Sequence, residues 1–411
     1  MHERFLCRHS NDTMRSSIIQ VCCGKMAATA VFSVMKRPYP ARQLTSGPGV
    51  IPMRINQIAS QTKSQTTAIR CALALLVGLT GFACLGASEG RAADEKHPPI
   101  AVRFSLDRPI NAADAPFVLA ATDGLFSSEG LAVTMDVANG SPEAIARVAA
   151  GASDFALVDI NALIRFRDKD AAPVKAVFML FNAAPYAIIA RKSRGIHALS
   201  DIEGKTLGVA DGDLSIRLWP ALARQNGIKT ASVKQNPMSS AVREPMLSAG
   251  QVDAVTGFSY LSAINLRDRG VPADDLAVLR FADYGCEAYG LAVIVNPAFA
   301  AKQPEAVRGF VRAAIVGTHL AIKSPEHAAD EVVSRMEDGS RDLELERLRA
   351  VIADNILTPE VKHNGLGGID PVRLERSINQ IAEDFKFSKR PSAADIFDDS
   401  FLPPLGGRLI N

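Results

Sequence analysis

Polar and aromatic side chains gather in the loops that follow predicted strands, where they could hydrogen-bond or stack on a small molecule. These candidates are Asp107, Arg108, Asn139, Ser141, Asp159, Asn161, Asn182, Asp211, Asp213, Phe258, Ser259, Tyr260, Tyr284, Glu287 and Tyr289. Carboxylates outnumber guanidinium groups in this set. Carboxylates beside aromatic rings suit a flat molecule with N–H donors or a positive charge, whereas an anion would favour arginine and helix N-termini. We therefore expect a nitrogen heterocycle or an amine, with an anion such as a sulfonate as the alternative.

Several candidates also have a purely structural interpretation. Arg108 could pair with Asp107 and never reach a ligand. Tyr284 and Tyr289 could pack a connection between two parts of the chain, and Trp219 is expected to anchor its own helix in a core.

The motifs of common enzymes do not occur in the sequence. There is no G-x-S-x-G and no H-E-x-x-H. EGKT at 203–206 is similar to the end of a phosphate-binding loop, but Leu199 stands where that motif needs glycine. We expect no catalytic residue, no metal and no cofactor. The histidines after the first 93 residues are scattered, none at metal-ligand spacing: His97, His197, His319, His327 and His363.

Strands and helices alternate from residue 100 onward, which predicts an α/β fold. IAVRFSLD, LAVTMDVA and DFALVDI are apolar runs of strand length, and helical segments separate them. Ser141, Pro142 and Glu143 open one of these helices, and Gly151 ends it. Strands separated by helices of this length predict a mostly parallel sheet flanked by helices.

One helix-to-strand corner occurs twice in the chain. Ala150-Gly151-x-x-Asp154 followed by FALVD matches Ala249-Gly250-x-x-Asp253 followed by AVTGF. The two aspartates are more simply explained as structural residues of an ordinary α/β turn. However, both strands end in polar or aromatic loops, and open α/β sheets bind ligands at the carboxyl ends of their strands. We therefore predict two sheets that share one cleft.

This organisation gives a first lobe of 94–190 plus 292–411 and a second lobe of 191–291. The connections are expected near 187–192 and 292–296, as hinge crossings. The two helices predicted between 342 and 385 are expected to pack on the first lobe.

The first 93 residues differ in charge from the rest of the chain. They contain 11 Lys and Arg against 3 Asp and Glu, whereas the remaining residues contain 35 against 41. The body is therefore mildly acidic, although the whole chain has a formal charge of +2. This balance argues against a nucleic-acid partner, for which a clustered basic face is expected.

This leader contains the pattern of a signal peptide. Arg70 precedes an uncharged run at 71–88, and small residues suited to cleavage follow. The signal region is expected at about 53–93, with Met53 near the true start. An uncleaved membrane anchor and a lipid-anchored form at Cys84 are the alternatives. The body contains only Cys286, which excludes a disulfide within it.

Six ordered stretches resemble a known family. They are APFVLAATDGLFSSEGLAV, AGASDFALVD, DIEGKTLGVADG, AGQVDAVTGF, ADYGCEAYGLAVIVNP and the helix after PEAVRGF. Together they resemble the ABC-transporter solute-binding proteins, in the branch that holds thiamine-pyrimidine synthase and the sulfonate, taurine and nitrate binders. The resemblance covers about Ile100 to Phe387.

This resemblance implies a type II periplasmic binding fold of the Venus-flytrap kind. It implies a periplasmic monomer that captures a small molecule, such as a thiamine precursor, and delivers it to an ABC permease with its ATPase. Enzyme members act through a cysteine-rich motif and histidine, so the single Cys286 favours binding over catalysis. A pyrimidine-synthesising enzyme and a sensor domain remain the alternatives. Pyrimidine-binding relatives often carry an aromatic residue where this chain has Arg108, after Leu106-Asp107.

Overall fold

The fold is known from a computed structural model, which describes residues 98–168, 172–210 and 212–410. All of them belong to one compact unit spanning Glu89–Asn411. The predicted signal region and Asp211 lie outside the described residues. Among the helices that the structure describes, none combines the length and apolar character that crossing a membrane requires.

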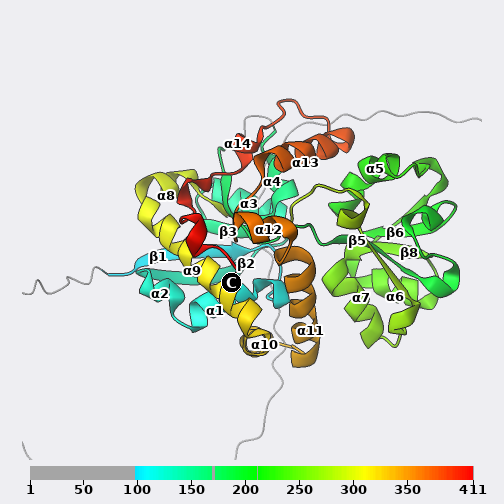
Figure 1. Cartoon of the computed structure of the whole chain (residues 1–411), viewed down its shortest axis with the longest axis horizontal. Coiled ribbons are helices and arrows are strands. Elements are labelled where there is room, and N and C mark those ends of the chain that lie inside the picture. The colour runs from blue at the N-terminus through cyan, green and yellow to red at the C-terminus, as the bar shows by residue number, and fades with distance from the viewer. Residues whose placement is uncertain (1–97, 169–171, 211, 411) are drawn as a thin grey trace, which may run out of the picture. The chain divides into compact units, whose positions relative to one another are not determined.

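The described chain forms two five-stranded sheets with the same internal plan (Figure 1). In each sheet, the first three strands in the order below run parallel to one another. The fourth strand runs antiparallel to both of its neighbours, the third and the fifth strands. Sheet A has the order β2 (Leu131–Val137), β1 (Ile100–Leu106), β3 (Phe155–Asp159), β10 (Leu291–Val295) and β4 (Lys175–Met179). Sheet B has the order β7 (Lys234–Met238), β6 (Thr206–Ala210), β8 (Ala254–Phe258), β5 (Tyr186–Arg191) and β9 (Leu276–Arg280).

The antiparallel members are β10 in sheet A and β5 in sheet B, and each follows a passage of the chain between the sheets. These passages lie at 180–185 and 285–290, because β4 precedes the first and β10 follows the second. The segments expected to cross, 187–192 and 292–296, instead lie mainly within β5 and β10. Apolar runs continue from the connections into the strands, so the pattern alone could not separate them. We propose lobe boundaries within 180–185 and 285–290.

Helices cover both sheets. In Figure 1, α5 lies on one side of sheet B, and α6 and α7 lie on the other. The helices of sheet B are α5 (Ser215–Gln225), α6 (Arg243–Ala249) and α7 (Ser259–Asp268). The others are α1 (Ala115–Thr122), α2 (Leu125–Ser128), α3 (Ser141–Ala149), α4 (Ile160–Phe166), α8 (Pro297–Lys302), α9 (Pro304–Lys323), α10 (Pro325–Val333), α11 (Arg341–Val351), α12 (Pro359–Asn364), α13 (Pro371–Asp384) and α14 (Ala393–Ile396).

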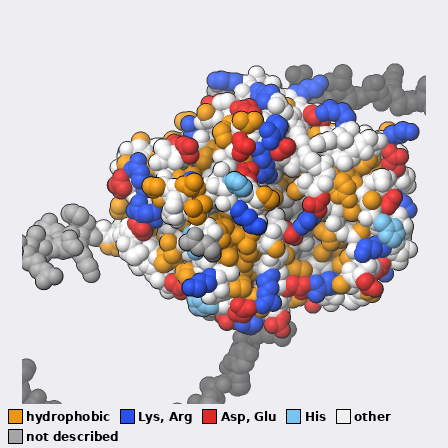
Figure 2. All heavy atoms as spheres, viewed as in Figure 1, with side chains coloured by type: hydrophobic (Ala, Val, Ile, Leu, Met, Phe, Trp, Pro, Cys, Tyr) orange, Lys and Arg blue, Asp and Glu red, His pale blue; other side chains and the backbone are white. Residues whose placement is uncertain are grey.

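Buried apolar side chains hold these layers together. Phe310 of α9 packs on sheet A, with its ring centroid 5.1 Å from that of Phe104 and 4.2 Å from that of Phe155. Trp219 of α5 is 1% exposed and lies in the apolar core, as expected. On the face shown in Figure 2, acidic and basic side chains are interspersed, with no large area of one sign.

The helices α11 and α13 contact the helices that cover sheet B, which the sequence did not indicate. Arg347 of α11 donates to Asn265 of α7 at 2.6 Å. On the other side, α13 packs against α5, and Arg224 of α5 forms an ion pair with Glu383 of α13. The C-terminal helices therefore link the two sheets.

The duplicated corner has one role in both sheets. Gly151 and Gly250 adopt positive φ angles of 73° and 79° after their helices. The carboxylate of Asp154 then accepts a hydrogen bond from the Arg103 backbone N–H at 2.8 Å. In the same way, Asp253 accepts from the Thr206 N–H at 2.7 Å. Each aspartate fastens the start of one strand to its parallel neighbour, which is the structural interpretation of this motif.

Candidate functional site

The ends of β1 and β3 and the start of α3 meet at the edge of sheet A where its parallel strands end. The Arg108 guanidinium donates to both oxygens of Asp107, at 2.7 and 2.8 Å. Ser141, at the start of α3, donates to the same carboxylate at 2.6 Å. The Ser141 hydroxyl also accepts from the backbone N–H of Asp159 at 3.1 Å. Burial opposes the charge of Arg108, but the Asp107 carboxylate holds its pKa above the ordinary value. The ends of β1, β3 and the start of α3 thus form one connected polar group.

A buried hydrogen-bond network connects this group to sheet B. Tyr186, the first residue of β5, donates its hydroxyl proton to Asp159. The side-chain amide nitrogen of Asn161 donates to Asp159 at 2.8 Å and to the Tyr186 hydroxyl at 3.1 Å. Burial raises the pKa of Asp159 to about 6, although the hydrogen bonds from Tyr186 and Asn161 lower it. All three side chains are buried.

Aromatic rings supply the facing surface from sheet B. The Arg108 guanidinium lies over the ring of Phe258, the last residue of β8, at 5.0 Å from its centroid. The Phe258 ring is stacked on Tyr260 at 6.0 Å and lies 6.1 Å from the ring of Tyr186. A cation over a ring face is an attractive arrangement. We call Asp107, Arg108, Ser141, Asp159, Asn161, Tyr186, Phe258 and Tyr260 the strand-end site.

Another polar group lies at the strand ends of sheet B. Asp213, in the loop after β6, accepts from Arg243 of α6 at 3.0 Å. It also accepts from Thr256 of β8 and from the Ser215 N–H at 2.9 Å. This partly buried pair positions Arg243, whose Nε has no partner among the described residues.

Some buried polar atoms in these groups have no hydrogen-bond partner within the described chain. They are Asn161 Oδ1, Tyr260 OH and Arg243 Nε. A buried polar atom without a partner costs about 1–3 kcal/mol, so native proteins contain few of them. These three atoms place unused donors and acceptors together at the strand ends. Burial raises the pKa of Tyr260, so its hydroxyl stays protonated at neutral pH.

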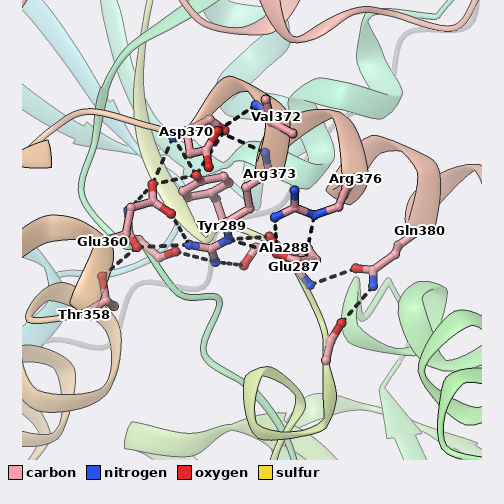
Figure 3. Close-up of polar contacts among 12 residues, drawn as sticks. Glu287, Ala288, Tyr289, Thr358, Glu360, Asp370, Val372, Arg373, Arg376 and Gln380 are labelled. Carbon is pink, nitrogen blue, oxygen red and sulfur yellow. Dashed lines mark hydrogen bonds and ion pairs between the residues drawn. The ribbon is translucent and has the colours of Figure 1, made fainter. Parts of the chain in front are cut away.

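The side chains of Asn182, Glu287 and Tyr289 belong to a second network, centred on Arg373 of α13 (Figure 3). The Tyr289 carbonyl joins this network to the strand-end site, because it accepts from the Asn161 amide at 2.8 Å. The Arg373 guanidinium donates to Glu360 at 2.8 Å and to the Asn182 carbonyl at 2.8 Å. It lies 4.1 Å from the Tyr289 ring centroid, and the Tyr289 hydroxyl donates to Glu360 at 2.7 Å. This network ties both connecting segments to α12 and α13.

The remaining candidates lie outside the strand-end site. Asn139 is exposed, and its backbone N–H donates to Glu143 at 3.0 Å. Tyr284 lies in a short helix after β9, where its carbonyl accepts from Asn226 at 2.9 Å. Ser259 lines a cavity of about 480 Å³ beside the connecting segments, together with Asn182 and Glu287.

Sequence reasoning missed four residues of these groups: Tyr186, Arg243, Glu360 and Arg373. Tyr186 could have been found, because it is the only aromatic residue in PYAIIARKS. No sequence signal links Arg373 to Asn182, which lies 191 positions earlier. Arg108 stands where pyrimidine-binding relatives often carry an aromatic residue. In the structure, Phe258 of the opposite sheet places an aromatic ring beside Arg108.

The buried carboxyl group of Asp114, next to the strand-end site, makes the stability of the protein depend on pH. Burial raises its pKa from 3.8 to about 7, against a hydrogen bond from the Asn111 N–H, and Asp107 and Glu344 add to the rise. The folded state therefore favours the protonated form, and the free energy of unfolding falls as the pH rises from about 4 to about 7. We expect Asp114→Asn to raise stability at about pH 8 by about 1–3 kcal/mol and to leave it nearly unchanged at about pH 4.

Urea unfolding at the two pH values measures this effect, with Asp342→Asn as the control, since Asp342 has a 96% exposed side chain. An Asp114→Asn protein with the stability profile of the wild type would contradict the prediction. Asp159 has a pKa raised in the same direction, so part of the wild-type slope persists in the variant.

The chain matches a family model and curated proteins. The model described as "NMT1/THI5 like" matches residues 111–328. A riboflavin-binding protein, RibY, of Chloroflexus aurantiacus is 28% identical over 222 residues, which are 53% of this chain and 61% of that protein, less than two thirds of its length. A 4-amino-5-hydroxymethyl-2-methylpyrimidine phosphate synthase of Legionella pneumophila is 25% identical, covering 53% of this chain and 68% of the relative. A formylaminopyrimidine-binding protein of Halalkalibacterium halodurans is 24% identical, covering 58% and 72%.

A solved structure supports the predicted fold class. The periplasmic aliphatic sulphonate binding protein SsuA from Escherichia coli superposes with a TM-score of 0.57, at 15% identity, over 76% of this chain and 92% of that one. This likeness concerns the fold and confirms the two-lobed periplasmic binding architecture. Among the described residues, no group of His, Cys, Asp and Glu side chains is arranged to hold a metal ion.

Proposed function

Because the chain belongs to the NMT1/THI5-like family, whose model matches residues 111–328, we propose that it captures a planar nitrogen heterocycle between its two sheets. An aminopyrimidine is the representative ligand. The protein acts outside the cytoplasm as a periplasmic solute-binding protein, works as a monomer and delivers the ligand to an ABC permease with its ATPase. The names of the relatives support this ligand class, since they refer to riboflavin, to a formylaminopyrimidine and to an aminopyrimidine phosphate.

The contact between Arg108 and Phe258 carries this proposal. Arg108 follows β1 of sheet A, and Phe258 ends β8 of sheet B, so the two facing surfaces meet at this pair. Movement of one lobe away from the other would part the guanidinium from the ring. A flat ligand could then stack on Phe258, while Asn161 Oδ1 accepts a hydrogen bond from it and the Tyr260 hydroxyl donates one.

The charge state of the site argues against the anion alternative. The guanidinium of Arg108 is already neutralised by the bidentate contact with Asp107. An anionic sulfonate would have to compete with that carboxylate for the same donors. A neutral heterocycle meets no such competition, because it can use the unpartnered atoms.

The enzyme alternative would need an activated nucleophile. Burial raises the pKa of the Cys286 thiol to about 11, so the thiol is protonated at neutral pH. Thiolates, not thiols, are the reactive species. We therefore propose binding without catalysis, and we favour transport over a sensor role because a solved neighbour of the same fold is named as the ligand-binding component of an ABC-type import system.

A thermal-shift screen tests the ligand class. Binding at about a hundred times Kd stabilises the folded state by about 2.7 kcal/mol, which gives a clear rise in Tm. We expect aminopyrimidines or a flavin to raise the Tm of the purified protein, with taurine and nitrate as the comparison. Stabilisation by taurine or nitrate without any by the heterocycles would overturn the proposed ligand class.

A further inference from the structure

A cavity lies at the connecting segments, and Ser259, between Phe258 and Tyr260 in the chain, lies at its border with the strand-end site. It has a volume of about 480 Å³, a size that suits a small organic molecule. Both connecting segments line it, through Ala183 and Cys286. The opposite sides come from Ser259 of α7, which is attached to sheet B, and from Asn355, in the turn of π-helix at Ile352–Ile356 after α11. The cavity is therefore bounded by parts of the chain attached to different sheets.

The charges around this cavity leave an excess of carboxylates. Its charged lining residues are Arg280, Asp283, Glu287, Asp354, Glu360 and Arg373. Arg280 pairs with both Asp283 and Asp354, while Arg373 pairs with Glu360 at 2.8 Å. One further cation reaches the group, since Arg376 contacts Glu287 at 3.2 Å. Four carboxylates therefore face three guanidinium groups, so a single positive charge would balance the cavity.

Two buried side chains that line the cavity have polar atoms without partners among the described residues. Asn355 is 2% exposed, and its amide nitrogen donates to the Ala183 carbonyl at 3.0 Å. This bond fixes the orientation of the amide and leaves Oδ1 as an unused acceptor. Ser259 is 7% exposed, and its hydroxyl is also unpartnered. A fixed acceptor beside excess negative charge selects a ligand with charged N–H donors.

We propose that this cavity binds a small organic monocation, an amidinium or primary ammonium group on a compact apolar body. The charged group donates to Asn355 Oδ1 and to the Ser259 hydroxyl, and the alanines of the lining contact the apolar body. Because Ser259 and Asn355 belong to parts attached to different sheets, the bound cation joins those parts. Occupancy of this site stabilises the arrangement in which the sheets are held together, whatever molecule the strand-end site takes.

Calorimetric titration of the full chain with benzamidine tests the site, and benzamide serves as the uncharged probe of nearly the same shape. We expect benzamidine to bind at least about tenfold more tightly than benzamide. Asn355→Ala should weaken benzamidine binding by about tenfold or more, whereas Asn355→Asp, which keeps an acceptor oxygen, should retain it. Ser259→Ala gives a second reading in case the Asn355 variants fold poorly.

Two control variants test whether benzamidine binding belongs to this cavity. Ser377→Ala also removes a buried, unpartnered hydroxyl, but Ser377 does not line the cavity, so affinity should be unchanged. Phe401→Leu alters an aromatic ring that does not line the cavity and should leave benzamidine binding in place. Equal binding of benzamide and benzamidine, wild-type affinity in both Asn355→Ala and Ser259→Ala, or loss of binding in Phe401→Leu would overturn the proposal.

Discussion

Replacing Arg373 by alanine lowers the free energy of unfolding by about 3–5 kcal/mol, the range for breaking a buried ion pair. The side chain is 15% exposed and contacts Glu360, Asn182 and the Tyr289 ring. Its removal leaves the Glu360 carboxylate, itself 15% exposed, without its cation. Backbone carbonyls of both connecting segments, at Asn182 and Ala288, lose donors at the same time. The variant therefore loosens the joint between the sheets as well as the core.

Arg376 provides a matched control one turn further along α13. Its side chain is 49% exposed and contacts only one carboxylate, Glu287, at 3.2 and 3.4 Å. Arg376→Ala should cost less than about 1 kcal/mol. Arg373→Lys should recover only part of the loss, because an ammonium group cannot reproduce the fork of donors. Urea unfolding of the three variants measures these differences, and equal losses for Arg373→Ala and Arg376→Ala would contradict the prediction.

Replacing Phe258 by alanine weakens capture of a nitrogen heterocycle by about tenfold to a hundredfold. The ring is the aromatic face that sheet B presents to Arg108, and it is stacked on Tyr260. Without the ring, a flat ligand loses its stacking partner and the guanidinium loses its cation–π contact. The effect concerns binding more than folding, because Phe258 is only partly buried.

Phe401 offers a control with the same local chemistry. The Arg308 guanidinium lies 5.6 Å from the Phe401 ring centroid, so this pair repeats the arrangement of Arg108 and Phe258 elsewhere on the chain. Phe401→Ala should leave ligand affinity unchanged. A comparable loss of affinity in both variants would mean that general destabilisation, not stacking in the site, causes the effect.

Local patterns in the sequence predicted much of the fold. Apolar runs such as Phe155–Asp159 and Leu291–Val295 are buried strands, because their side chains face helices on both sides. Lys234–Met238 gave no strand signal because it is a mostly exposed edge strand that contains Pro237. The corner aspartates Asp154 and Asp253 were correctly interpreted as structural residues.

The site was harder to predict, because its contacts join distant parts of the chain. Arg108 and Asp107 are neighbours in sequence, and their pairing was anticipated as an alternative to ligand contact. The approach of Arg108 to Phe258 depends instead on how the two sheets face each other, which no local pattern encodes. Glu287 and Tyr289 were assigned by their loop alone, but α12 and α13 supply their partners, Glu360, Arg373 and Arg376.

The central claim is that one ligand is held by the strand ends of both sheets. Its most direct test is calorimetric titration of 4-amino-2-methylpyrimidine into the wild-type protein, Phe258→Ala and Asn161→Ala. We predict binding to the wild type and a loss of about tenfold or more in each variant, since Phe258 ends a strand of sheet B and Asn161 follows one of sheet A. Binding that survives unchanged in either variant, or no binding to the wild type, would contradict the claim.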